Sequence, residues 1–111
     1  MEQISNITNY HIVLQVQEVM RRLYGDKLQE VILFGSYARG EEHEDSDMDF
    51  LIVLNEEKIE SWRELNYVMD DIFALEFKHN TVISPHIVSK NKFQNKNNLF
   101  IEQVTNDGIT L

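Results

Sequence analysis

Two short motifs contain the residue types best suited to chemistry. Gly35 and Ser36 follow an apolar run, and after ten intervening residues Asp47 and Asp49 open a second apolar run. A glycine turn leaves backbone N–H groups accessible, and with the N-terminus of a following helix it binds phosphate oxygens without a lysine. Carboxylates suit Mg²⁺, which commonly combines one or two of them with substrate phosphates. The two motifs together predict a site for a nucleoside triphosphate and its magnesium ion.

Each motif residue has a candidate role in such a site. Gly35 and Ser36 are candidate nucleotide-binding residues, and Arg39, one helical turn further on, can reach a phosphate or hold the acidic loop that follows. Side chains alternate along a strand, so Asp47 and Asp49 should project from one face while the residue between them enters the core. We expect these two carboxylates to be both metal ligands and catalytic residues.

Three other interpretations compete with this one. The run from Asp45 to Asp49, with Glu56 further on, imitates EF-hand spacing, but the sixth loop position is Phe50 where a glycine is required. A Walker P-loop is excluded because no Gly-Lys-Ser/Thr is present. The third alternative makes Gly35 a plain turn and the aspartates capping and loop charges. Both motifs beside apolar strands at this spacing favour the nucleotide site.

The elements that must position these motifs alternate between helix and strand. Apolar residues recur at helical spacing in three segments and form strand-like runs in four others, and glycines mark several ends. Ser36 is expected to cap a short helix from Tyr37 that Gly40 ends, and Pro85 should place its strand at a sheet edge. The expected elements are helices over 8–24, 56–77 and 99–104, a helical turn over 90–94, and strands over 28–34, 48–54, 81–89 and 109–111.

This order predicts an α/β (α+β) fold in which helices pack on a short mixed β-sheet, as a single domain over residues 1–111. The chain has no cysteine, which excludes disulfides and thiolate zinc sites. Its net charge of −9, from 19 acidic and 10 basic residues, argues against direct binding of nucleic acid. No apolar run suits a membrane span, and residues 1–9 lack a secretory signal pattern, so we expect a cytoplasmic protein.

The chain resembles the minimal nucleotidyltransferases, small members of the DNA-polymerase-β-like nucleotidyltransferase superfamily, in two runs: Gly35-Ser36-Tyr37-Ala38-Arg39-Gly40 and Ser46-Asp47-Met48-Asp49. The resemblance implies a polymerase-β palm-like fold and Mg²⁺-dependent transfer of a nucleoside monophosphate, AMP from ATP, to a hydroxyl. In this family the glycine and serine hold the NTP and the aspartates hold Mg²⁺. Many minimal members are antitoxins encoded beside a HEPN-domain protein, and some adenylylate a tyrosine of that partner. A HEPN-type partner is therefore implied here, and a homo-oligomer remains open.

One departure from the family concerns the next strand. Active members usually place a third carboxylate there, as metal ligand and general base, whereas residues 81–89 contain no acidic residue. Ser84 and His86 share a face by their spacing, so one of them should occupy that position. His86 is a candidate catalytic base near neutral pH, and its alternative role is that of a half-buried strand residue. The alternative function is a catalytically weak or inactive nucleotide-binding module that neutralises its partner by binding.

Overall fold

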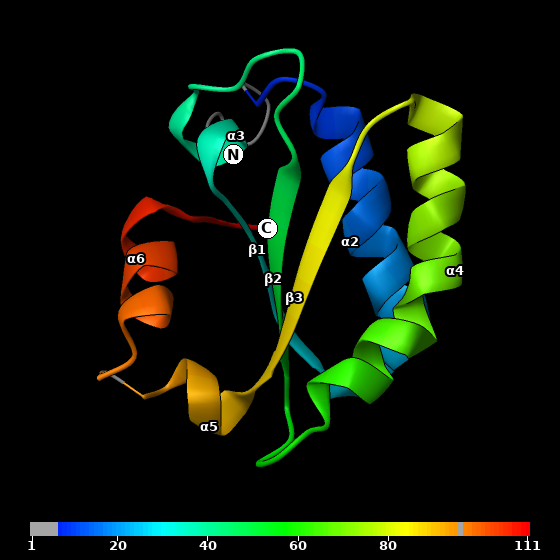
Figure 1. Ribbon diagram of the computed structural model, residues 1–111. Helices are drawn as coiled ribbons and strands as arrows, with labels where there is room; N and C mark the ends of the chain where they lie inside the picture. The colour runs from blue at the N-terminus through cyan, green and yellow to red at the C-terminus, as the bar shows by residue number, and fades with distance from the viewer. Residues whose placement is uncertain (1–6, 96) are drawn as a thin grey trace.

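The computed structural model describes residues 7–95 and 97–111, so most of the segment searched for a secretory signal lies outside it. Helices and strands alternate along the chain (Figure 1). Among the described residues, no helix combines the length and the apolar character needed to cross a membrane. The elements are α2 (Tyr10–Tyr24), η1 (Gly25–Lys27), β1 (Leu28–Phe34), α3 (Ser36–Arg39), β2 (Met48–Leu54), α4 (Ser61–His79), β3 (Ile83–Ser89), α5 (Lys90–Phe93), α6 (Leu99–Asp107) and β4 (Ile109–Thr110).

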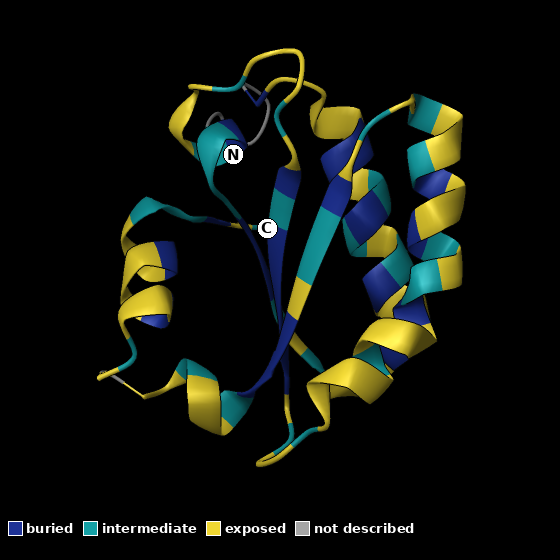
Figure 2. Cartoon of the chain, viewed as in Figure 1, coloured by how far each residue is buried: buried dark blue, intermediate teal, exposed yellow. Residues whose placement is uncertain are grey.

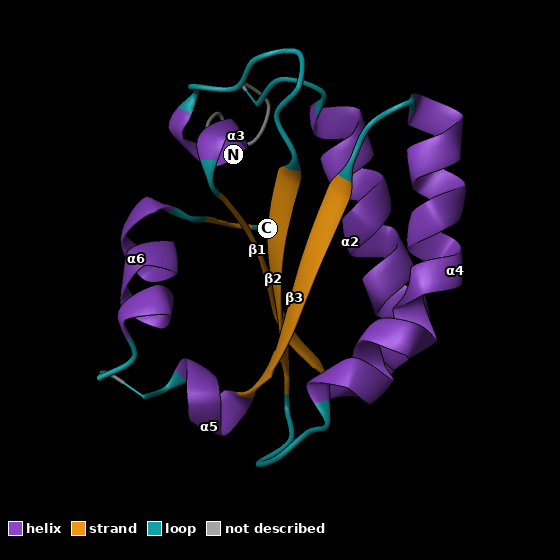
Figure 3. Cartoon of the chain, in the orientation of Figure 1, coloured by secondary structure: helices purple, strands orange, loops and turns teal. Residues whose placement is uncertain are grey.

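The four strands form one mixed sheet in the order β3-β2-β1-β4. β1 pairs antiparallel with both β2 and β4, whereas β2 and β3 are parallel and are joined by the long helix α4. Helices α2 and α4 lie on one side of the sheet, and α5 and α6 lie on the other (Figure 3). The predicted α/β class with a short mixed sheet is confirmed.

β2 is the centre of the core because helices cover both of its faces. Five consecutive residues, Phe50–Leu54, are buried, which explains why this strand reads as a continuous apolar run (Figure 2). Phe50 and Ile52 pack towards α2 and α4, while Leu51 and Val53 pack towards α6. This rigid strand begins at Met48, directly between the two aspartates of the motif.

Several expected boundaries differ from those in the structure. The expected cap is wrong: Gly35 is the N-cap of α3, and Ser36 is already its first helical residue with no side-chain capping bond. Helix α4 begins at Ser61 rather than at residue 56, because Ile59 packs against the core from the preceding loop. Helix α6 continues beyond residue 104 to Asp107.

β3 lies at the sheet edge, as Pro85 predicted, and its outer edge is closed to further strand pairing over part of its length. β3 is an edge strand, and Pro85 within it has no N–H to donate. The Ile83 N–H donates to Glu76 Oε2 at 2.8 Å, and the Ser61 hydroxyl donates to the Ile87 carbonyl at 3.1 Å. Both partners come from α4, so this helix occupies backbone groups that another strand would otherwise bind.

Candidate active site

The Gly-Ser turn connects the end of β1 to the short helix α3. Gly35 has φ 76° and ψ −156°, a conformation essentially restricted to glycine. Its carbonyl accepts hydrogen bonds from the N–H groups of Ala38 and Arg39, at 3.1 and 3.2 Å. The N–H groups of Ser36 and Tyr37 come earlier in the helix and have no partner within it. The turn therefore presents backbone donors of the kind that bind phosphate oxygens.

The fold brings the glycine and the second aspartate into direct contact. Phe34, the residue before the turn, pairs with Asp49 across the antiparallel β1–β2 ladder. A Cβ atom built on Gly35 would collide with Asp49 Oδ2, so the glycine leaves the space that this carboxylate occupies. Asp47 is exposed just before β2, and Met48 between the aspartates is fully buried. The two motifs thus form one continuous site.

Asp49 is the electrostatically perturbed member of this site. Partial burial is the main cause and raises the pKa of its carboxyl above the ordinary value. His86 lowers this pKa, Asp47 raises it, and Arg39 lowers it. The four groups come from β2, the loop before it, β3 and α3. The net result is that the positive groups nearby do not fully compensate for the burial of the negative charge on Asp49.

The raised pKa predicts that Asp49 lowers stability at neutral pH. The folded state holds the Asp49 proton more tightly than the unfolded state does, so stability falls as pH rises from the unfolded pKa through the folded one. Asp49→Asn should therefore raise Tm at pH 7 by about 3 °C in the absence of nucleotide and metal. The gain should shrink towards pH 4, where the parental carboxyl becomes protonated. Thermal unfolding followed by circular dichroism measures the gain in Tm at pH 7 and at pH 4. The control is Asp45→Asn, which changes an exposed carboxylate of the loop before β2. An equal gain for Asp49→Asn at both pH values would contradict this account.

Arg39 is engaged by carboxylates in this structure. Its Nε donates to Glu41 Oε1 at 2.9 Å, and its guanidinium lies 3.8 Å from Asp107 Oδ2 at the end of α6. Of its two expected roles, holding the acidic loop is the one seen here. An incoming phosphate would compete with both carboxylates for this side chain.

The register of β3 separates the two candidates for the missing carboxylate. Ser84 is the residue paired with Asp49, whereas His86 pairs with Leu51, two residues further along. His86 instead joins an aromatic cluster: its ring centroid lies 5.4 Å from that of Phe34 and 5.6 Å from that of Phe100. The sequence reasoning missed both phenylalanines. Phe34 could have been found from its position before the glycine, but nothing in the sequence pointed to Phe100.

The two aspartates fit a magnesium ion that is shared with a nucleotide. Asp47 and Asp49 form none of the ion pairs found among the described residues, so their oxygens are available. Within residues 7–95 and 97–111, no group of three or more His, Cys, Asp or Glu side chains is arranged to hold a metal ion by itself. Mg²⁺ is commonly held by one or two carboxylates plus substrate phosphates, which is the set that this site offers.

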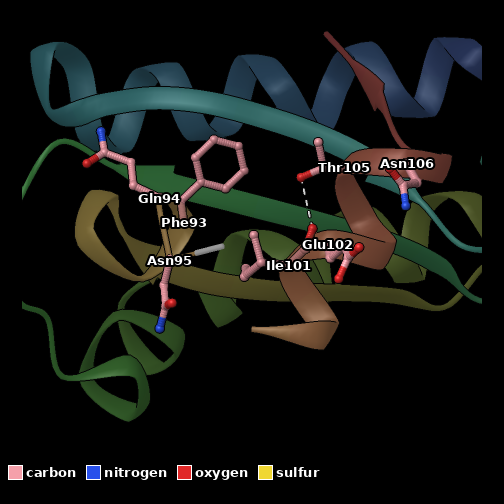
Figure 4. A pocket seen from close by; sticks show the side chains of 7 residues that line it. All are labelled: Phe93, Gln94, Asn95, Ile101, Glu102, Thr105 and Asn106. Atoms are coloured by element: carbon pink, nitrogen blue, oxygen red, sulfur yellow. Dashed lines mark hydrogen bonds between the residues drawn. The ribbon is translucent and has the colours of Figure 1, made fainter. Parts of the chain in front are cut away.

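A separate apolar pocket of about 500 Å³ lies between α5 and α6 (Figure 4). In it the Thr105 hydroxyl donates to the Ile101 carbonyl at 2.8 Å, so this hydroxyl is already hydrogen-bonded within α6. None of the predicted site residues lines this pocket, and it is distinct from the candidate active site. Its lining residues are Phe93, Gln94, Asn95, Ile101, Glu102, Thr105 and Asn106.

Comparison with known sequences gives consistent matches. The family described as "Nucleotidyltransferase domain" matches residues 13–110. A Methanocaldococcus jannaschii protein, provisionally named a protein adenylyltransferase, is 34% identical over 98 residues, which cover 88% of this chain and 93% of that protein. A second protein of that organism with the same provisional name is 35% identical, over 71% of this chain and 72% of its own length.

Comparison with solved structures supports the fold. A structure provisionally named a minimal nucleotidyltransferase has a TM-score of 0.58 and 27% identity, over 96% of this chain and 99% of its own. A chain from a toxin–antitoxin structure with AMP-PNP has a TM-score of 0.63 and 20% identity, over 93% of this chain and 72% of its own. A chain from a Shewanella oneidensis complex of a tri-AMPylated HEPN toxin with an MNT antitoxin has a TM-score of 0.58 and 16% identity, over 93% of this chain and 71% of its own. The family match over residues 13–110 and the 34% identity show that this chain belongs to the nucleotidyltransferase domain family and is a nucleotidyltransferase.

Proposed function

We propose that this protein transfers AMP from ATP to a hydroxyl group of a partner protein. The observation that carries the proposal is the contact between Gly35 and Asp49, which joins a turn with open backbone donors to a pair of available carboxylates. The names of the Methanocaldococcus jannaschii relatives support protein as the acceptor and adenylyl as the transferred group.

Different residues of the site bind the phosphates and the metal ion. The N–H groups of Ser36 and Tyr37, at the start of α3, bind phosphate oxygens of the triphosphate. Asp47 and Asp49 hold Mg²⁺ against the same phosphates. When bound, the ion neutralises charge on the leaving pyrophosphate and orients the α-phosphorus for in-line attack. The Arg39 guanidinium keeps the acidic loop against α6 through Glu41 and Asp107.

The acceptor hydroxyl must lose a proton as it attacks. In the proposed reaction the hydroxyl oxygen forms a bond to the α-phosphorus. The bond between the α-phosphorus and the oxygen that bridges the α- and β-phosphates breaks, and pyrophosphate leaves. His86, whose ring centroid lies 5.4 Å from that of Phe34 beside the turn, is the candidate base that takes the hydroxyl proton. Ser84, which pairs with Asp49, cannot supply the carboxylate base that relatives usually have there.

We further propose that the acceptor is a tyrosine of a HEPN-domain toxin, which makes this protein its antitoxin in the cytoplasm. The support is the likeness in fold to the antitoxin chain of the Shewanella oneidensis complex, whose HEPN toxin is tri-AMPylated. The likeness to a toxin–antitoxin structure containing AMP-PNP adds support for an adenine nucleotide.

The test is a transfer assay with α-labelled ATP, MgCl₂ and the protein encoded by the gene next to that of this chain, which we expect to contain a HEPN domain. The label should appear on the partner, EDTA should abolish it, and Tyr→Phe changes in the partner should locate the acceptor. His86→Ala should lower the transfer rate by about 100-fold if the imidazole is the base, and should flatten the pH–rate profile near neutrality. Absence of label on the partner at millimolar Mg-ATP would refute protein adenylylation.

A second function is favoured by one observation, the lack of an acidic residue on β3. In that case the protein binds a nucleotide without turnover and neutralises its partner by covering it. The two functions differ in cells: a non-catalytic protein neutralises the partner equally well after the aspartates have been replaced.

A further inference from the structure

A second hollow, which we call the edge groove, lies along the exposed edge of β3. Its volume of about 290 Å³ is at the lower limit of small-molecule pockets, and suits one or two side chains rather than a nucleotide. Figure 1 shows β3 at the open edge of the sheet, with α4 on one side and α5 and α6 on the other. The groove is lined by residues of all four elements, including Trp62, Leu65, Pro85, His86, Lys92 and Phe100.

The lining of the edge groove combines exposed apolar surface with a cation. Trp62 is 62% exposed and Leu65 is 38% exposed, and because they lie three residues apart on α4 and both line the groove, they form one continuous apolar surface there. Aromatic side chains of this kind are enriched at the centres of protein interfaces. Lys92 forms none of the ion pairs found among the described residues, so its ammonium is available to a carboxylate.

The edge groove is continuous with the candidate active site. His86 lines the groove and lies 5.4 Å, between ring centroids, from Phe34, the residue that pairs with Asp49. Phe100 also lines the groove and contacts the same Phe34 ring at 5.6 Å. A protein seated in the groove therefore has its own surface beside the aspartates, where a hydroxyl acceptor is required.

We propose that the edge groove docks the acceptor protein, which inserts an apolar side chain beside Trp62 and Leu65 and places a neighbouring carboxylate against Lys92. This inference rests on the proposed function for the identity of its occupant. Docking through side chains is favoured over an added strand, because Glu76 and Ser61 occupy two backbone groups on this edge and Pro85 has no N–H.

The test measures docking apart from chemistry, by calorimetric titration without nucleotide of the protein encoded by the gene next to that of this chain, which we expect to contain a HEPN domain. Leu65→Glu should weaken binding by at least about 10-fold, and Lys92→Glu by about 5-fold. The matched control is Leu14→Glu on α2, because Leu14 is exposed to 41%, almost the same extent, and does not line the groove. It should bind within about twofold of the parent, and circular dichroism should show all variants folded.

The outcomes distinguish this inference from the proposed function. If transfer occurs, Leu65→Glu should raise the KM for the acceptor protein and leave kcat unchanged, since only binding is lost. Binding that is weakened by Leu65→Glu without any transfer would refute catalysis and keep the docking site. Parental affinity in Leu65→Glu, or no binding by the parent, would overturn the docking site. A parental dimer in sedimentation that Leu65→Glu dissociates, with partner binding unchanged, would assign the groove to a second copy and also overturn it.

Discussion

Replacing Asp47 and Asp49 together by asparagine should reduce AMP transfer by at least about 1000-fold, because the site then has no charged ligand for magnesium. The change should leave the fold intact, since Asp47 is exposed and asparagine nearly matches the shape of the partly buried Asp49. Loss of label from the partner protein in the α-labelled ATP assay measures the effect. Millimolar Mg-ATP should raise the Tm of the parent and not that of the variant, because a ligand stabilises the state that binds it.

The control for this double variant is Glu44→Gln with Asp45→Asn, two exposed acidic residues of the same loop. This variant removes the same number of charges and should keep transfer within about twofold, as expected for surface substitutions. If both double variants lost activity equally, the general acidity of the loop would explain the result. Full neutralisation of the partner in cells by the Asp47→Asn, Asp49→Asn variant would favour the binding-module function instead.

Gly35→Ala should have the second largest effect, because it damages both the turn and the carboxylate beside it. The new Cβ would meet Asp49 Oδ2, and the backbone at φ 76° and ψ −156° is essentially closed to alanine. We expect a loss of about 2–4 kcal/mol in the free energy of unfolding, the range of severe backbone and steric changes. Nucleotide binding should also become undetectable. Urea unfolding and the Mg-ATP shift in Tm measure the two effects.

Gly40→Ala is the matched control, because Gly40 has a similar φ of 70° but lies in the ordinary left-handed region with ψ 24°. No atom lies within 4 Å of a Cβ built there. This variant should cost only about 1 kcal/mol, the usual strain of a left-handed alanine, and should keep the Mg-ATP shift. Equal effects of the two substitutions would mean that backbone strain alone, and not the contact with Asp49, makes Gly35 necessary.

The central strands were predictable because their apolar runs have clear ends. Leu28–Phe34 and Met48–Leu54 were predicted with the bounds that the structure shows, since Gly35 and the acidic loop interrupt the two runs sharply. The start of α4 was not predictable from apolar spacing. Ile59 matches the helical period but packs from a loop, and periodicity cannot distinguish these two cases.

The candidate site was predictable as a set of motif residues but not as a geometry. The spacing of Gly35 and Asp49 along the chain gave no indication that a glycine Cβ would collide with the carboxylate. The sequence also left Ser84 and His86 equivalent, because both lie on one strand face. The pairing of Ser84 with Asp49 depends on the β2–β3 register, which is set by long-range packing around α4 rather than by local sequence.

The closed edge of β3 has a consequence for how such proteins diversify. Because Glu76 and Ser61 occupy its backbone groups and Pro85 has no N–H, recognition at this edge depends on side chains. Surface side chains change with little effect on stability, whereas backbone pairing is shared by every sequence with the same fold. Duplicated copies of this gene can therefore acquire different partners through a few substitutions at positions such as Trp62 and Leu65.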